Sequence, residues 1–107
     1  MRENYKEYIP QGRSELLEYT TFLVLSGPNF VDHYFPNQTL DTVFDAFVEG
    51  LGRVEKKLGR ETYTLLLDLT EKAREHYRRD PESTNDGVEA ATALLLEIED
   101  ILKSSRR

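Results

Sequence analysis

The residues from position 40 to position 58 repeat apolar side chains at the spacing of an α-helix. Successive apolar positions are separated by 3, 1, 3, 1, 3, 3 and 4 residues, and together they define one face of a helix. These positions are Leu40, Val43, Phe44, Phe47, Val48, Leu51, Val54 and Leu58. Asn37 or Thr39 is a suitable N-cap and Gly59 a suitable terminator. The pattern predicts one long amphipathic helix, which must bury that face against other elements.

A second predicted helix precedes it, from an N-cap at Ser14 to about Leu25. Its apolar side chains crowd toward the C-terminal half, which predicts that this end is buried. The β-branched and aromatic residues of 20–24 also favour a strand, which stays open as an alternative. Ser26-Gly27-Pro28 ends the element, since Gly27 can supply a left-handed residue and Pro28 cannot continue a helix.

Two more helices are predicted in the second half of the chain. One begins at Arg60 or Glu61 and runs to about Arg79, and the following Asp80-Pro81 ends it. The other begins after Asp86 as N-cap, with Glu89 in capping-box position. Its apolar stripe comprises Val88, Ala91, Leu94, Leu95, Ile98, Ile101 and Leu102. The short connections between the last three helices predict antiparallel neighbours.

Two segments are less regular. Residues 1–9 are predicted to form a short helix or a turn, which ends at Pro10 and Gly12. The aromatic stretch of 28–38 is expected to fold back onto the core, because each exposed aromatic ring would forgo about 1.5–3 kcal/mol of burial. The sequence therefore predicts an all-α, single-domain antiparallel helical bundle over residues 1–107, with four main helices and one or two short ones.

Composition narrows the classes of function. The 107 residues include 20 acids, 14 bases and no Cys, with a formal net charge of −6. This balance disfavours nucleic acid as a partner, since phosphates are repelled. The longest apolar run has four residues, Phe22 to Leu25, against about 20 for a membrane span. Glu3 and Glu7 stand where a signal peptide carries cations. We expect a cytoplasmic protein that binds neither nucleic acid nor membrane.

A search for catalytic motifs predicts that the chain is not an enzyme and holds no cofactor or metal. The phosphate-binding, dinucleotide-binding, nucleophile-elbow and EF-hand patterns are absent. A helical di-metal site needs Glu three residues before His, but Phe30 precedes His33 and Ala73 precedes His76 at that spacing. Arg74 and Arg78 share a face, and the interleaved Glu71 and Glu75 are expected to pair with such bases across helical turns.

Acidic side chains are the candidate binding residues. Asp41, Asp45 and Glu49 recur every four residues and lie roughly opposite the apolar face of their helix. Helix electrostatics explains much of this row, because acids favour the N-terminal half of a helix and bases the C-terminal half. A second acidic group on the last helix comprises Glu97, Glu99 and Asp100. If the two helices are neighbours, the two groups merge into one surface.

The stretch GRETYTLLLDLTEKAREHY, followed by DP, a polar loop and GVEAATALLLEIEDIL, resembles small all-helical immunity proteins of bacterial contact-dependent and polymorphic toxin systems. The resemblance covers roughly residues 40–102 and rests on size, acidity and helical layout. It implies a stoichiometric inhibitor that covers an essential surface of a toxin. It carries over no functional residue, because the stretch holds no motif.

The leading hypothesis is therefore a non-enzymatic inhibitor, an immunity protein or antitoxin that neutralises a cognate basic toxin, plausibly a nuclease, through these six carboxylates. The alternative is a helical adaptor or regulatory module that self-associates or binds a partner helix. It would use the Gly50 and Gly52 ridge or the aromatic loop from Phe30 to Phe35. The sequence leaves the oligomeric state open.

Overall fold

The computed structural model describes residues 9–28, 30 and 38–104, and these residues form an all-helical globule without a strand. Four long helices and one short helix follow one another: α1 (Arg13–Ser26), α2 (Leu40–Arg53), α3 (Glu55–Leu58), α4 (Arg60–Arg78) and α5 (Gly87–Ser104). The predicted fold class is confirmed. The strand alternative for residues 20–24 is wrong, since these residues lie within α1. The element predicted at the N-terminus lies, apart from Ile9, outside the described residues.

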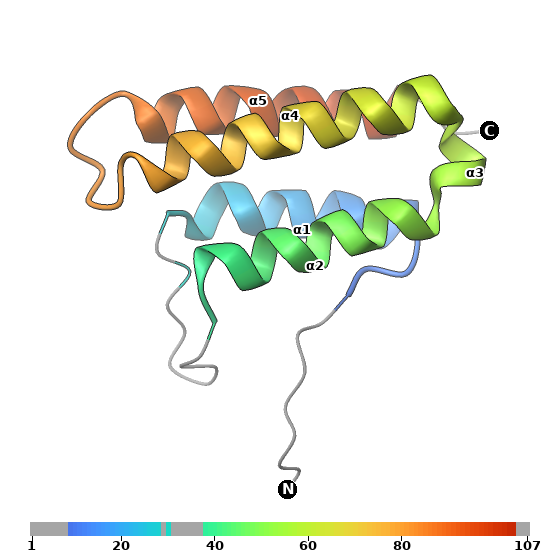
Figure 1. The fold of residues 1–107 in the computed structure, drawn as a ribbon, viewed down its shortest axis with the longest axis horizontal. Coiled ribbons are helices and arrows are strands. Elements are labelled where there is room, and N and C mark those ends of the chain that lie inside the picture. Colours follow the sequence, from blue (N-terminus) through green and yellow to red (C-terminus); the bar gives the residue numbers. More distant parts are fainter. Residues whose placement is uncertain (1–8, 29, 31–37, 105–107) are drawn as a thin grey trace, which may run out of the picture.

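Successive long helices run in opposite directions along the length of the molecule, so neighbours are antiparallel (Figure 1). Helix α1 packs against α2 and α5, and α4 packs against α2 and α5. Helices α2 and α5 do not contact each other, so they occupy opposite corners of the bundle. This placement decides whether the two predicted acidic groups share a surface.

The core is filled by the apolar faces that the periodicity indicated, together with one aromatic side chain from the α1–α2 connection. Phe30 is 1% exposed, and its ring centroid lies 5.7 Å from that of Phe22, 5.8 Å from that of Tyr77 and 6.1 Å from that of Phe44. The expectation that this stretch folds back onto the core is therefore confirmed for Phe30. The remaining aromatic residues of the stretch lie outside the described residues.

Helix boundaries follow the sequence signals in part. Thr39 caps α2: its hydroxyl accepts from the Thr42 backbone N–H, and the Thr42 hydroxyl accepts from the Thr39 backbone N–H. Gly59 separates α3 from α4 with a φ of +91°, which glycine adopts without strain. The prediction of one continuous helix to Leu58 is wrong, because the chain breaks at Val54 before the short α3. The predicted N-cap at Ser14 is also wrong, since Ser14 lies inside α1, which begins at Arg13 with Gly12 as its N-cap.

Gly27 ends α1 for a different reason from the one predicted. Its φ is −69°, so it is not left-handed. It lies instead against the ring of Tyr77, whose hydroxyl donates to the Leu23 carbonyl at 2.9 Å. A methyl group built on Gly27 would lie 2.6 Å from Tyr77 Cε2 and 2.7 Å from its Oη. The packing of the Tyr77 ring against the C-terminal end of α1 therefore requires glycine here.

We expect Gly27→Ala to lower the free energy of unfolding by about 1–3 kcal/mol, because the buried Tyr77 ring must move to admit the methyl group. Gly52→Ala is the matched control. The nearest atom to its new methyl group would be Tyr63 Oη, at an ordinary contact distance of 3.7 Å. Alanine in place of glycine also favours the helix by about 0.5–1 kcal/mol. Urea unfolding of both variants checks this, and equal shifts in the same direction would contradict it.

The connection between α4 and α5 is organised by Asp80, which is 1% exposed. Its carboxylate accepts backbone N–H groups from Thr84 at 2.7 Å, Asn85 at 3.1 Å and Val88 at 3.2 Å. The Asn85 side chain accepts from the Gly87 N–H at 2.8 Å. The predicted N-cap position is confirmed, since α5 begins directly after Asp86, whose carbonyl accepts from the Ala90 N–H. The side chains that accept from the first amides of α5 are those of Asp80 and Asn85.

None of the helices in the described part of the chain combines the length and apolarity needed to cross a membrane.

Candidate functional site

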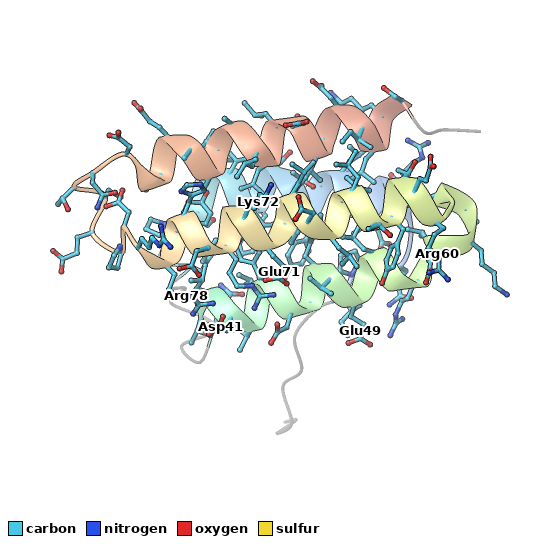
Figure 2. The ribbon with its side chains drawn as sticks, turned by 45° about the horizontal axis from the view of Figure 1, so that its top comes forward. Asp41, Glu49, Arg60, Glu71, Lys72 and Arg78 are labelled. Atoms are coloured by element: carbon cyan, nitrogen blue, oxygen red, sulfur yellow. The ribbon has the colours of Figure 1, made fainter. Side chains whose placement is uncertain are left out.

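The acidic row on α2 faces two arginines of α4. Arg74 Nη1 lies 2.9 Å from Asp45 Oδ1 and 3.2 Å from Asp41 Oδ1, and Arg78 Nη2 lies 3.0 Å from Asp41 Oδ1. Figure 2 shows Asp41 and Arg78 directed toward each other across the seam between the two helices. The row therefore borders α4, and the chain's own arginines hold the first two carboxylates.

Arg74 is the centre of this network. Its side chain is only 10% exposed, while those of Asp41 and Asp45 are 55% and 71% exposed. Glu71 adds a third carboxylate at 3.1 Å, and the guanidinium carbon lies 5.5 Å from the centroid of the Phe44 ring. The Nε of Arg74 is buried without a hydrogen-bond partner among the described residues. The seam between α2 and α4 thus buries the Arg74 guanidinium, and the more exposed carboxylates of Asp41, Asp45 and Glu71 accept most of its hydrogen bonds.

The electrostatic consequences follow from these contacts. Hydrogen bonds from Arg78 and Arg74 hold the pKa of Asp41 below its usual value of 3.8. Burial disfavours the charged form of Arg74, but the hydrogen bonds to Asp45 and Asp41 outweigh it and raise the pKa of the guanidinium. Both groups are therefore charged at neutral pH, as a structural ion pair requires.

The third carboxylate of the α2 row and further charges of α4 are also paired within the chain. Glu49 Oε2 lies 3.1 Å from Arg53 Nη2, one helical turn away. Arg79, directly after the end of α4, has its Nε 3.1 Å from Glu75 Oε2, which confirms the predicted pairing across turns. All three carboxylates of the α2 row consequently have a basic partner in their own chain.

The acidic group on α5 differs in this respect. Glu97 and Asp100 are exposed and Glu99 is half-buried, and the same helix carries Glu89 but only Lys103 as a base. Within residues 9–28, 30 and 38–104, no base forms an ion pair with any of these four carboxylates. We call Glu89, Glu97, Glu99 and Asp100 the α5 acidic group.

The two acidic groups do not merge. Helices α2 and α5 lie at opposite corners of the bundle and make no contact. The condition under which the sequence predicted one joint surface is therefore not met. Any partner that contacts the α5 acidic group approaches a different side of the molecule from one that contacts the α2 row.

The histidines are the remaining residues with metal-binding or acid–base chemistry. His76 is half-buried near the end of α4, and His33 lies outside the described residues. The described part of the chain holds no group of three or more His, Asp or Glu side chains placed to bind a metal ion.

Comparison with known proteins gives no family. The chain matches no family model, no curated protein and no solved structure. The similarity to immunity proteins stays a prediction.

The structural roles of two residues, Arg74 and Asp80, were not predicted from the sequence. Arg74 lies four residues after Thr70 and one after Ala73, both fully buried, so its position at the rim of the apolar face of α4 was a usable signal. Asp80 was assigned only a role in ending α4. Its contacts reach up to eight residues along the chain, through a loop whose path no local pattern specifies.

Proposed function

We propose that the chain is a non-enzymatic protein-binding inhibitor of the immunity-protein or antitoxin class, which neutralises a basic toxin through the α5 acidic group. The observation that carries this proposal is the contrast between the two acidic surfaces. The α2 carboxylates are held by Arg74, Arg78 and Arg53, while the α5 acidic group lacks ion pairs among the described residues.

An acidic helix whose carboxylates form no ion pairs among the described residues suits association with a basic protein. Unpaired surface carboxylates project a negative potential that accelerates the approach of a cationic partner, and this effect falls with ionic strength. Paired carboxylates contribute less, because a nearby guanidinium cancels their field. We therefore place the partner surface on α5 rather than on α2, where Asp41 and Asp45 hold Arg74 in place.

The experiment uses the product of the gene directly upstream as the candidate toxin. We expect this product to arrest growth when expressed alone, and co-expression of the chain to restore growth through a stoichiometric complex. An upstream product that is harmless, or that arrests growth whether or not the chain is present, would contradict the proposal.

Charge reversal on α5 is expected to slow association with that toxin. For Glu97→Lys with Asp100→Lys we expect the association rate constant to fall by about tenfold or more at low salt, with a flatter salt dependence. Glu49→Lys with Glu82→Lys is the matched control, since it changes the net charge equally at exposed positions off α5. Stopped-flow kinetics at several salt concentrations measures both. Equal slowing by the two pairs would mean that net charge alone steers the encounter.

A helical adaptor remains the second candidate, because Leu25 on α1 is 77% exposed. The surfaces predicted for it, the Gly50 and Gly52 ridge and the loop from Phe30, each include a residue that is buried. Gly50 is buried, with the Pro10 carbonyl 3.0 Å from a Cβ built there, and Phe30 belongs to the core. Sedimentation equilibrium separates the candidates: a dimer that persists in high salt and dissociates in Leu25→Ser would favour the adaptor.

A further inference from the structure

A recess of about 300 Å³ lies between α4 and the C-terminal end of α5. It is lined by Asp100, Thr62, Ser104 and Ile101, residues whose side chains carry one carboxylate, two hydroxyls and one aliphatic group. The Ser104 hydroxyl donates its proton to the Asp100 carbonyl at 2.9 Å, so its oxygen remains able to accept a hydrogen bond. The recess therefore offers hydrogen-bond acceptors beside an apolar wall.

One helical turn away from the lining residues, α4 and α5 continue the same chemistry. Leu65 lies one helical turn from Thr62 on α4 and is 45% exposed. Glu97 lies one turn from Asp100 on α5, and it is exposed and without an ion pair among the described residues. A side chain that enters here meets aliphatic surface along its stem and negative charge at its tip.

We propose that this recess takes an arginine side chain of the basic partner, an inference that rests on the proposed function. The methylene stem packs against Ile101 and Leu65, and the guanidinium donates to the Asp100 carboxylate and to the hydroxyl oxygens of Thr62 and Ser104. Arginine fits better than lysine, because its planar fork donates in parallel to a carboxylate while further N–H groups reach neighbouring acceptors. An anionic or wholly apolar side chain has no comparable complement in this lining.

The test titrates the full chain with N-acetyl-arginine amide and follows the methyl resonances of Thr62 and Ile101 by NMR. We expect saturable shifts centred on these residues, with N-acetyl-lysine amide binding more weakly. Asp100→Asn should weaken arginine amide binding by about two- to fivefold, which is the range for an exposed ion pair. Asp86→Asn, the same change at an exposed position at the other end of α5, should leave binding unchanged. Thr62→Leu, which fills the recess, should abolish the shifts at Ile101.

Each result decides between the occupants. Shifts that do not saturate, or equal weakening by Asp100→Asn and Asp86→Asn, would overturn the recess as an arginine site. Binding that emerges only when Arg106 and Arg107 are replaced with serine would assign the recess to the chain's own C-terminus. If arginine amide fails to bind while reversal of Glu97 and Asp100 still slows toxin association, the recess proposal fails and the proposed function stands. Arginine amide binding with no toxin complex would contradict the proposed function instead.

Discussion

Replacing Asp80 with alanine is expected to lower the free energy of unfolding by about 3 kcal/mol. The buried carboxylate accepts three backbone N–H groups that have no other acceptor among the described residues. Hydrogen bonds to a charged group contribute about 1.5–3 kcal/mol each before relaxation. After truncation, water must enter the loop or the amides must turn outward. The connection between α4 and α5 then loses its fixed path.

Two measurements check this expectation. Urea unfolding should show the loss for Asp80→Ala, a smaller loss for Asp80→Asn, which keeps one carbonyl oxygen, and a change within about 0.5 kcal/mol for the exposed loop control Glu82→Ala. Hydrogen exchange should accelerate at the amides of Thr84, Asn85 and Val88. A loss below about 1 kcal/mol for Asp80→Ala would show that the three bonds do not hold the loop.

The second large effect is expected at Arg74, and it depends on which partner of the network is removed. Arg74→Ala should cost about 2–4 kcal/mol, since it removes the ion pairs and the packing of the side chain over Phe44. Arg74→Met keeps most of that packing and leaves only half-exposed carboxylates behind, so its cost should stay below about 1.5 kcal/mol. Asp41→Asn with Asp45→Asn should cost more than Arg74→Met, because it leaves the buried cation with Glu71 alone.

Acid titration tests the same network. The folded-state pKa of Asp41 is lowered, so its contribution to stability is complete above the unfolded-chain value of 3.8 and is lost as the pH falls through the lower folded-state pKa. Stability of the wild-type protein should therefore fall below about pH 4 more steeply than that of Arg78→Met, which removes the hydrogen bond that lowers the pKa of Asp41 most. Parallel curves for the two proteins would contradict the assignment of Arg78 as the main cause of that lowered pKa.

The number and type of the long helices followed from periodicity, because each helix buries one apolar face and the spacing records that face directly. The break at Val54 did not follow, since Val54 and Leu58 continue the period without interruption. Gly50 and Gly52 lower the local helix propensity, and the turn into α4 then depends on tertiary packing that no local pattern records. Gly27 shows the same limit: its position at the end of α1 was predictable, but its contact with Tyr77 joins residues fifty positions apart.

The acidic residues of the candidate site were predictable from the sequence, but which of the two acidic groups is free of internal ion pairs was not. Both acidic groups were visible in the sequence, and the α2 row looked stronger because of its regular four-residue spacing. Its partners Arg74 and Arg78 lie 29 to 37 residues away in sequence, so only the packing of α2 on α4 reveals that the row serves the chain itself. The α5 acidic group has a less regular spacing, and its interest comes from the absence of ion pairs to its carboxylates among the described residues.

The α2 carboxylates stabilise the fold by holding Arg74, whereas we propose that those of α5 are available to a partner. The free energy of unfolding of two charge-reversed proteins, measured side by side by urea titration, tests this division of roles. Asp41→Lys with Asp45→Lys places two cations against the buried Arg74 and should cost more than about 2 kcal/mol. Glu97→Lys with Asp100→Lys should change stability by no more than about 0.5 kcal/mol per site. Equal losses in the two proteins, or a larger loss for the α5 pair, would contradict the account.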